Sequence, residues 1–139
     1  MRLNQPPLGG PAFRRLMDGQ LKEHEWQGQV EQALDVYGWW WMHIPANVVV
    51  CPRCCTRIYR GIRKGVPDIW AIRPPYMLWI ECKTQHGHLR PEQRQLMDMI
   101  RACGLIAIRA RPSDRDRVLE LIANPDVLNE ASPGVSGPF

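Results

Sequence analysis

Apolar residues recur at steps of three and four positions between Lys22 and Tyr37, which is the spacing of an amphipathic helix. The apolar positions of this stretch are Trp26, Val30, Ala33, Leu34 and Tyr37. Gly38 follows directly and suits the end of a helix, because glycine readily adopts the left-handed conformation found there. The pattern therefore predicts a helix over 22–37 that turns one face toward a core.

Two short apolar segments farther along the chain have the composition of strands. Asp68–Ile72 and Met77–Ile80 are rich in branched, aromatic and other large apolar residues, as strands usually are. Arg73–Tyr76 separates them and contains two consecutive prolines, which favour a turn. We therefore expect the two segments to pair as a hairpin.

Strands are also expected before and after this hairpin, at Trp39–Ile44 and Leu105–Ala110. The three adjacent tryptophans of the first must divide between two faces of a sheet, because side chains alternate along a strand. Helices are expected at Pro91–Cys103 and from Ser113 onward. The residues of the first of these helices expected to face inward are Leu96, Met99, Ile100 and Cys103. This order predicts an α/β fold, with a mixed central β-sheet flanked by helices.

The length of 139 residues, 45% of them hydrophobic, suits one globular domain. We expect this domain at 21–123, between a flexible N-terminal arm at 1–20 and a flexible C-terminal tail at 124–139. No apolar run approaches the ~20 residues of a membrane span, and the N-terminal residues lack an apolar signal region. The sequence therefore predicts a cytoplasmic protein with no membrane partner.

Three charged residues stand where a buried strand would not favour them. Asp68 begins the first segment of the hairpin, and Glu81 and Lys83 end the second. Glu81 and Lys83 are two positions apart and share a face of the strand, and the hairpin brings Asp68 near Glu81. Two carboxylates beside an ammonium group suit Mg²⁺, which prefers oxygen ligands. The lysine could orient a water or stabilise charge that develops on a phosphate.

The competing interpretation is that these three residues are solvated charges at strand ends that form a surface ion pair. Short motifs of this kind often match by chance. The chain has only three lysines, however, against fifteen arginines. A lysine two positions after a strand-end glutamate is therefore not a product of lysine-rich composition.

Three motifs in order carry a family resemblance. Gly65–Asp68 reads GVPD, Glu81–Thr84 reads ECKT, and Leu89–Gln93 reads LRPEQ. Together they resemble the PD-(D/E)xK nuclease superfamily, and within it the VRR-NUC (virus-type replication-repair nuclease) domain, over about residues 22 to 122. The resemblance implies a restriction-endonuclease-like core and a DNA endonuclease that uses Mg²⁺ or Mn²⁺. It also implies a role in phage or bacterial DNA replication or repair, with selectivity for branched, junction or flap DNA.

The same resemblance assigns roles to individual residues. Asp68, Glu81 and the backbone carbonyl of Cys82 would bind the metal, and Lys83 would act on the attacking water. Gln93 would help to position that lysine and the water, and Glu23 would support the metal or its water from the first helix. Glu25 competes with Glu23 for this role, and the favourable interaction of an acidic residue with a helix N-terminus is an alternative explanation of either. Arg90 stands where the family usually has a helix-capping serine, which costs about 1 kcal/mol of cap stability.

A basic segment precedes Asp68 and is the predicted DNA contact. Its basic residues are Arg53, Arg57, Arg60, Arg63 and Lys64. Because it leads directly into Asp68, we expect it to line the cleft beside the metal and to contact phosphates; a solvated basic loop is the alternative. The net charge of +4 and the pI of about 9.0 are compatible with a DNA partner. Resolvases of branched DNA usually act as dimers, so a homodimer is one expectation.

Cys51, Cys54 and Cys55 include the C-x-x-C spacing of a zinc knuckle. A structural zinc site needs four ligands, and no second pair follows in the sequence, so the count argues against structural zinc. Two alternatives to the nuclease stay open. One is a non-catalytic DNA-binding module, and the other is a small zinc-binding regulator of nucleic acid built around these cysteines.

Overall fold

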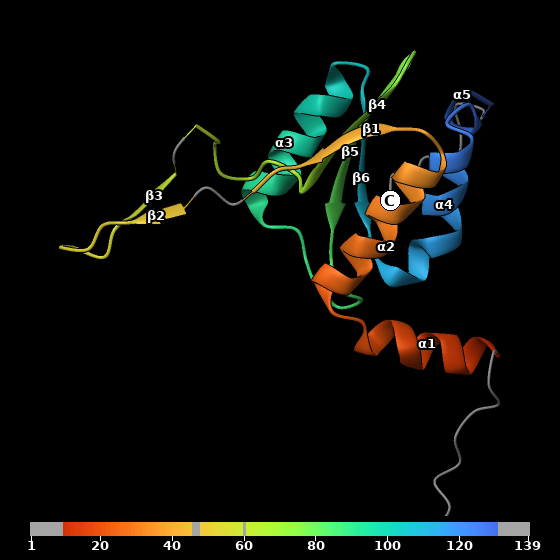
Figure 1. Ribbon diagram of the computed structural model, residues 1–139, viewed down its shortest axis with the longest axis horizontal. Helices are drawn as coiled ribbons and strands as arrows, with labels where there is room; N and C mark the ends of the chain where they lie inside the picture. The colour runs from red at the N-terminus through yellow and green to blue at the C-terminus, as the bar shows by residue number, and fades with distance from the viewer. Residues whose placement is uncertain (1–9, 46–47, 60, 131–139) are drawn as a thin grey trace, which may run out of the picture.

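The computed structural model describes residues 10–45, 48–59 and 61–130. A four-stranded sheet lies at its centre, with helices on both faces (Figure 1). The strands of this sheet are β1 (Trp40–His43), β4 (Ile69–Arg73), β5 (Tyr76–Cys82) and β6 (Ile106–Ala110). The strand order is β1-β4-β5-β6. The pairs β1–β4 and β4–β5 are antiparallel, whereas β5–β6 is parallel. The predicted hairpin and the predicted mixed α/β sheet are therefore confirmed.

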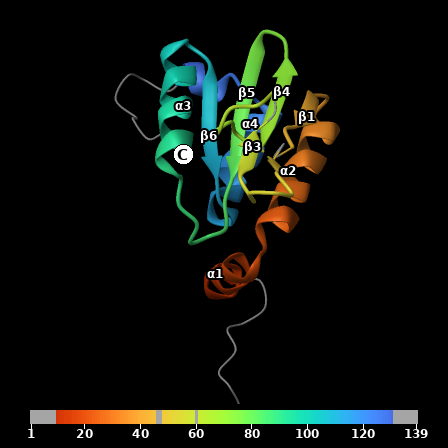
Figure 2. The ribbon, with the colours of Figure 1, turned by 90° about the vertical axis from the view of Figure 1, so that its left-hand side faces the viewer.

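The helices divide between the two faces of the sheet (Figures 1 and 2). Helices α2 (Glu23–Val36) and α4 (Arg115–Ala123) pack on one face, which we call the core face. Helix α3 (Pro91–Ala102) lies against β6 on the opposite face, which we call the α3 face. The helices cover the two faces unequally. On the core face α2 and α4 enclose one large apolar cluster, whereas on the other face α3 contacts chiefly β6.

Alternation along the strands sorts the side chains between these faces. Ile69, Leu78 and Ile80 are fully buried on the core face, where each contributes about 1.5–3 kcal/mol relative to exposure. Two tryptophans join this cluster and satisfy their indole N–H groups. Trp26 donates to the Ala110 carbonyl at 2.9 Å, and Trp39 donates to the Ile122 carbonyl at 2.8 Å.

Helix α3 differs from its prediction in the face that it buries. Met97 is fully buried, and Leu96 and Ile100 are half-buried, but Met99 is 58% exposed and Cys103 is exposed. The inward stripe is therefore displaced by about one position from the predicted one. The inward places of Met99 and Cys103 were wrong, because Met97 and not Met99 stands one helical turn after Gln93 on the face toward the sheet.

Both ends of the described chain contain more helix than the sequence indicated. Helix α1 (Pro11–Gln20) occupies half of the expected N-terminal arm, and its buried Asp18 forms an ion pair with Arg115 at 3.2 Å. A short 3₁₀ turn, η1 (Pro112–Asp114), precedes α4, and α5 (Val127–Glu130) follows it. No helix in the described ranges has the length and apolar character that crossing a membrane requires.

The segment before Asp68 is not a simple loop. Strands β2 (Val48–Val50) and β3 (Arg57–Tyr59) pair antiparallel as a separate two-stranded sheet, with the cysteine turn between them. Figure 1 shows this hairpin projecting away from the central sheet. The expectation that the whole basic segment lines a cleft beside Asp68 is therefore wrong for the hairpin.

Candidate active site

The antiparallel register of β4 and β5 places Asp68 beside Glu81. Ile69 pairs with Ile80, so the residue before β4 lies next to the residue after Ile80 on the α3 face. The backbone N–H of Cys82 donates to Asp68 Oδ2 at 2.8 Å and holds this carboxylate at the end of β5. The two predicted carboxylates therefore meet on one face of the sheet.

Glu81 is the centre of this cluster and is only 1% exposed. Its Oε1 atom accepts two contacts, from Lys83 Nζ at 2.5 Å and from Gln93 Nε2 at 2.6 Å. Its Oε2 atom is buried and has no hydrogen-bond partner among the described residues. A buried carboxylate oxygen without a partner costs free energy, so this atom is suited to a ligand.

Gln93 is positioned by the start of its own helix. Its Oε1 accepts the backbone N–H of Arg90 at 2.9 Å, and its Nε2 reaches Glu81. The glutamine thus caps α3 and orients Glu81 with opposite ends of one amide group. This bond satisfies the backbone N–H of Arg90, whereas a serine at the cap would accept the backbone N–H of Gln93. The Arg90 side chain has no acceptor and makes no cap hydrogen bond, so the expected cost of losing the serine stands.

Gly65 brings the segment before Asp68 against the same end of α3. A Cβ atom at this position would lie 2.7 Å from the Glu92 carbonyl oxygen, and the glycine has a φ of +95°. Both features exclude ordinary side chains. Lys64, the neighbouring residue, forms an ion pair with Glu92 at 3.1 Å, so the GVPD motif is packed on the helix that supplies Gln93.

Burial and mutual repulsion shift the acidity of both carboxyl groups. The pKa of Glu81 rises to about 7, first because burial penalises its charged form and second because of the charge on Asp68, while Lys83 opposes the rise. The pKa of Asp68 is also raised, chiefly by burial, although the Cys82 N–H and Lys83 lower it. Each of these carboxyl groups makes ionisation of the other less favourable. A cation nearby would favour the charged form of both.

The two candidate glutamates of α2 have different surroundings. Glu25 Oε2 accepts the backbone N–H of Lys22 at 2.9 Å and so caps its own helix. Glu23 is exposed at the first position of α2, and its negative charge contributes to the raised pKa values of Asp68 and Glu81. Of the two, Glu23 is the one whose charge acts on both carboxyl groups. His43 also acts on Asp68, whose pKa it lowers.

Asp68 and Glu81 fit a divalent metal by their chemistry. Both supply carboxylate oxygens, and Glu81 Oε2 is unpartnered. The Cys82 side chain is buried in the core cluster, and burial raises its pKa, so only its backbone could contribute. No group of three or more His, Cys, Asp or Glu side chains in the described ranges is arranged to hold a metal. Backbone oxygen and water would therefore complete the ligand set, as Mg²⁺ commonly requires.

The predicted DNA-binding residues do not form one cluster. Arg53 and Arg57 are exposed on the projecting hairpin, and Arg60 lies outside the described residues. Arg63 is exposed on the segment that returns to the sheet, where Lys64 contacts the start of α3. Among the described residues of the basic segment, Lys64 is the one that contacts the helix supplying Gln93.

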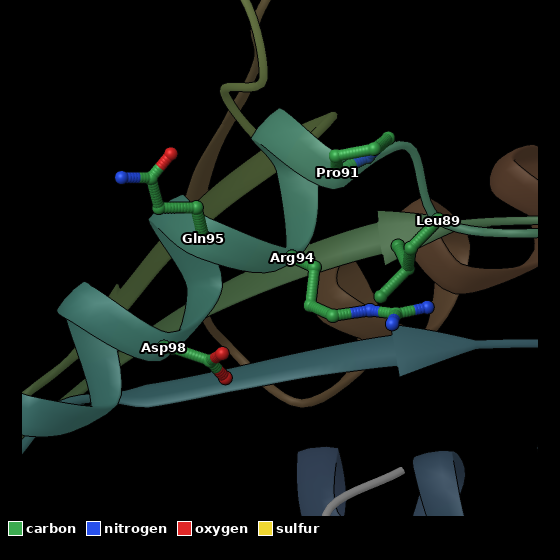
Figure 3. Close-up of a pocket in the computed structure, with 5 residues that line it drawn as sticks. All are labelled: Leu89, Pro91, Arg94, Gln95 and Asp98. Carbon is green, nitrogen blue, oxygen red and sulfur yellow. The ribbon is translucent and has the colours of Figure 1, made fainter.

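Sequence analysis did not single out the arginines around α3 and β6. Arg109 pairs in register with Glu81, and burial, then the charge of Arg111 and Arg94, lowers its pKa. Arg94 also lines an open pocket on α3, shown in Figure 3 with its other lining residues, Leu89, Pro91, Gln95 and Asp98. None of the candidate metal ligands lines this pocket. Arg109 could have been noticed as a charge inside a predicted strand, but its pairing with β5 is not visible in the sequence.

Comparison with known proteins identifies no relative of this chain. No protein-family model, no curated protein and no solved structure matches the chain. The site is therefore interpreted from its own residues. A carboxylate pair, an ammonium group and an orienting amide lie together on the α3 face, an arrangement that can bind a divalent cation and stabilise negative charge.

Proposed function

We propose that this protein is a metal-dependent DNA endonuclease of the PD-(D/E)xK type, with the VRR-NUC domain as its family and a restriction-endonuclease-like core. The observation that carries the proposal is the buried, unpartnered Oε2 of Glu81. It lies in a side chain that Lys83 and Gln93 orient, beside the carboxylate of Asp68. An ion pair at the protein surface would not bury the Glu81 carboxylate in this way.

Asp68, Glu81 and the Cys82 carbonyl would hold Mg²⁺ or Mn²⁺. The bound cation would polarise a phosphoryl oxygen and make a water more acidic at neutral pH. Glu23, whose charge raises the pKa of both ligands, would add to the negative field that attracts the cation. Because Asp68 and Glu81 share this field, binding a cation replaces their mutual repulsion by attraction.

Lys83 has the central role among the residues that do not bind metal. Its side chain is 12% exposed and its ammonium group contacts Glu81 Oε1, so the charge is held at the edge of the carboxylate pair. From this place it can donate a hydrogen bond to the attacking water or to a phosphate oxygen that gains charge. Gln93 keeps Glu81 in the orientation that this arrangement needs. Glu23 and Gln93 are therefore positioning residues, and Lys83 is the catalytic one.

The proposed substrate is DNA, with a preference for branched, junction or flap structures in phage or bacterial replication or repair. The basic segment supplies contacts to phosphates that are independent of sequence. Symmetric cutting of a junction requires two sites, so a homodimer is the assembly proposed for that substrate.

Calorimetric titration with Mn²⁺ tests the metal site without DNA. We expect the wild-type protein to bind Mn²⁺ and Asp68→Asn to bind it about ten- to a hundredfold more weakly, because the variant loses one charged ligand. Asp116→Asn, which changes an exposed aspartate on α4, is the matched control and should bind as the wild type does. Equal binding by both variants would remove Asp68 from the ligand set.

A further inference from the structure

Six tryptophans are present in the chain, and the sheet divides them into two groups. Trp26, Trp39 and Trp41 lie on the side of α2 and α4, and each donates its indole N–H, the last to Asp35 Oδ1 at 2.7 Å. Trp40, Trp70 and Trp79 lie on the α3 face. Trp70 and Trp79 have no hydrogen-bond partner for the indole nitrogen among the described residues.

The second group forms a continuous row across three strands, which we call the tryptophan row. Trp70 and Trp79 are register partners, and their rings stack with centroids 5.5 Å apart and an interplanar angle of 12°. The Trp40 ring meets Trp70 edge-on, at 5.7 Å and 83°. Exposure increases toward β1, since Trp70 and Trp79 are half-buried while Trp40 is 58% exposed.

Little in the described structure covers the outer end of this row. Helix α3 packs against β6, at the opposite side of the sheet from β1. Met42, next to Trp70 in the register, is 39% exposed. An exposed tryptophan beside an exposed methionine on an edge strand leaves apolar surface to water, which is typical of a binding surface.

The tryptophan row is continuous with the candidate active site. Trp70 is two residues after Asp68 on β4, and Trp79 is two residues before Glu81 on β5, so all four side chains share the α3 face. Two residues along a strand span about 7 Å. In a nucleotide only the sugar separates phosphate from base, so the base of a nucleotide whose phosphate is held through the metal at Asp68 and Glu81 reaches the near end of the row, at Trp70 and Trp79. Trp40 pairs with Ile72, two residues beyond Trp70, and lies at the distance of the next nucleotide.

We infer that the tryptophan row stacks unpaired nucleobases next to the phosphate to be cleaved, which makes single-stranded or locally unpaired DNA the preferred substrate. This inference rests on the proposed nuclease function and specifies its substrate class. Aromatic rings bind bases by stacking only where the bases are unpaired and accessible. Paired bases within a duplex present no free face to the row, so binding distinguishes flaps, loops and single strands from intact duplex.

The test compares two single strands that differ only in their bases. A fluorescent oligothymidylate and an abasic strand of the same length carry the same phosphates, so charge contacts cancel. Binding is measured in EDTA with the whole chain. We expect the wild type to bind the oligothymidylate roughly ten- to a hundredfold more tightly, and Trp40→Ala to lose most of this preference. Trp40→Phe, which keeps a ring, should retain it.

Tyr37→Ala is the matched control, because Tyr37 is an exposed aromatic residue at the C-terminal end of α2, 43% exposed. It should keep the base preference. Cleavage of flap and duplex DNA with Mg²⁺, measured for the same variants, should show the flap preference falling in Trp40→Ala alone.

The outcomes separate this inference from the nuclease proposal. Equal binding of both strands by a wild type that cuts DNA with Mg²⁺ would reject the stacking surface and keep the nuclease. Base-dependent binding that Trp40→Ala abolishes, without cleavage under any metal, would keep the surface and reject the nuclease. If Trp40→Ala instead converts a dimer into a monomer and leaves base preference unchanged, the row is an interface between copies and the inference is wrong.

Discussion

Replacing Lys83 with alanine should lower the rate of metal-dependent DNA cleavage by about 10²- to 10⁴-fold, the usual effect of removing one catalytic donor or acid–base group. The ammonium group of Lys83 contacts Glu81 Oε1 at 2.5 Å, so its removal takes away the positive charge nearest to the carboxylate pair. Gln93 still donates to Glu81 in this variant, and we expect it to fold. Single-turnover cleavage of an end-labelled oligonucleotide measures the effect on the chemical step.

The small number of lysines makes the control simple. Lys22 is exposed at the start of α2, and its backbone N–H, not its side chain, contacts Glu25. Lys22→Ala removes the same charge from the chain and should cleave DNA at nearly the wild-type rate. If Lys22→Ala and Lys83→Ala lose activity equally, the effect is one of net charge, and the catalytic role of Lys83 is wrong.

Replacing Glu81 with glutamine should stabilise the metal-free protein at neutral and alkaline pH. The pKa of Glu81 is about 7 in the folded protein, against an ordinary value of 4.5. Between these values the unfolded chain ionises before the folded one, so ionisation of Glu81 increasingly favours unfolding as pH rises. A shift of this size corresponds to a loss on the order of 3 kcal/mol of wild-type stability between about pH 4.5 and 7. Glutamine does not titrate and avoids that loss.

Urea unfolding at several pH values in EDTA measures this effect. The free energy of unfolding of Glu81→Gln minus that of the wild type should grow as pH rises through this window and level off above it. Glu92→Gln is the control, because the pKa of Glu92 is lowered, first by a backbone hydrogen bond and then by Lys64. The free energy of unfolding of Glu92→Gln minus that of the wild type should not grow as pH rises. Parallel stability curves for wild type and Glu81→Gln would show that burial of Glu81 carries no cost, and would weaken the case for a preorganised metal ligand.

The part of the site that follows from local pattern was accessible from the sequence. The branched and aromatic composition of two apolar runs and the proline turn between them located the β4–β5 hairpin, and a hairpin leaves little freedom in which residues are neighbours. The proximity of Asp68 to Glu81 follows from that register. The stripe of α2 was predictable for Trp26, Val30, Ala33 and Leu34, which are all buried. Its fifth predicted member, Tyr37, was wrong, because α2 ends at Val36 and Tyr37 is exposed.

The remaining features depend on contacts between distant segments. Which face of α3 is buried, with Met97 inside and Met99 outside, depends on its packing on β6 and on the close approach of Gly65 to Glu92, and periodicity alone does not show these contacts. The β2–β3 hairpin has three-residue strands with Val50 and Ile58 exposed, too short for a clear alternation. The exposure of Trp40 depends on α3 lying over β6 and not over β1. The sequence predicted that the tryptophans divide between two faces, but not which face stays open.

The Asp68–Glu81–Lys83 cluster is proposed to cut DNA with a divalent metal. The most direct measurement is cleavage of plasmid, single-stranded, flap and four-way-junction DNA by the purified wild-type protein in Mg²⁺, in Mn²⁺ and in EDTA, with binding followed in parallel. We predict cleavage in either metal, none in EDTA, and the fastest cleavage on substrates with unpaired or branched segments. Binding of these DNAs without cleavage in either metal would contradict the claim and would identify a DNA-binding module instead.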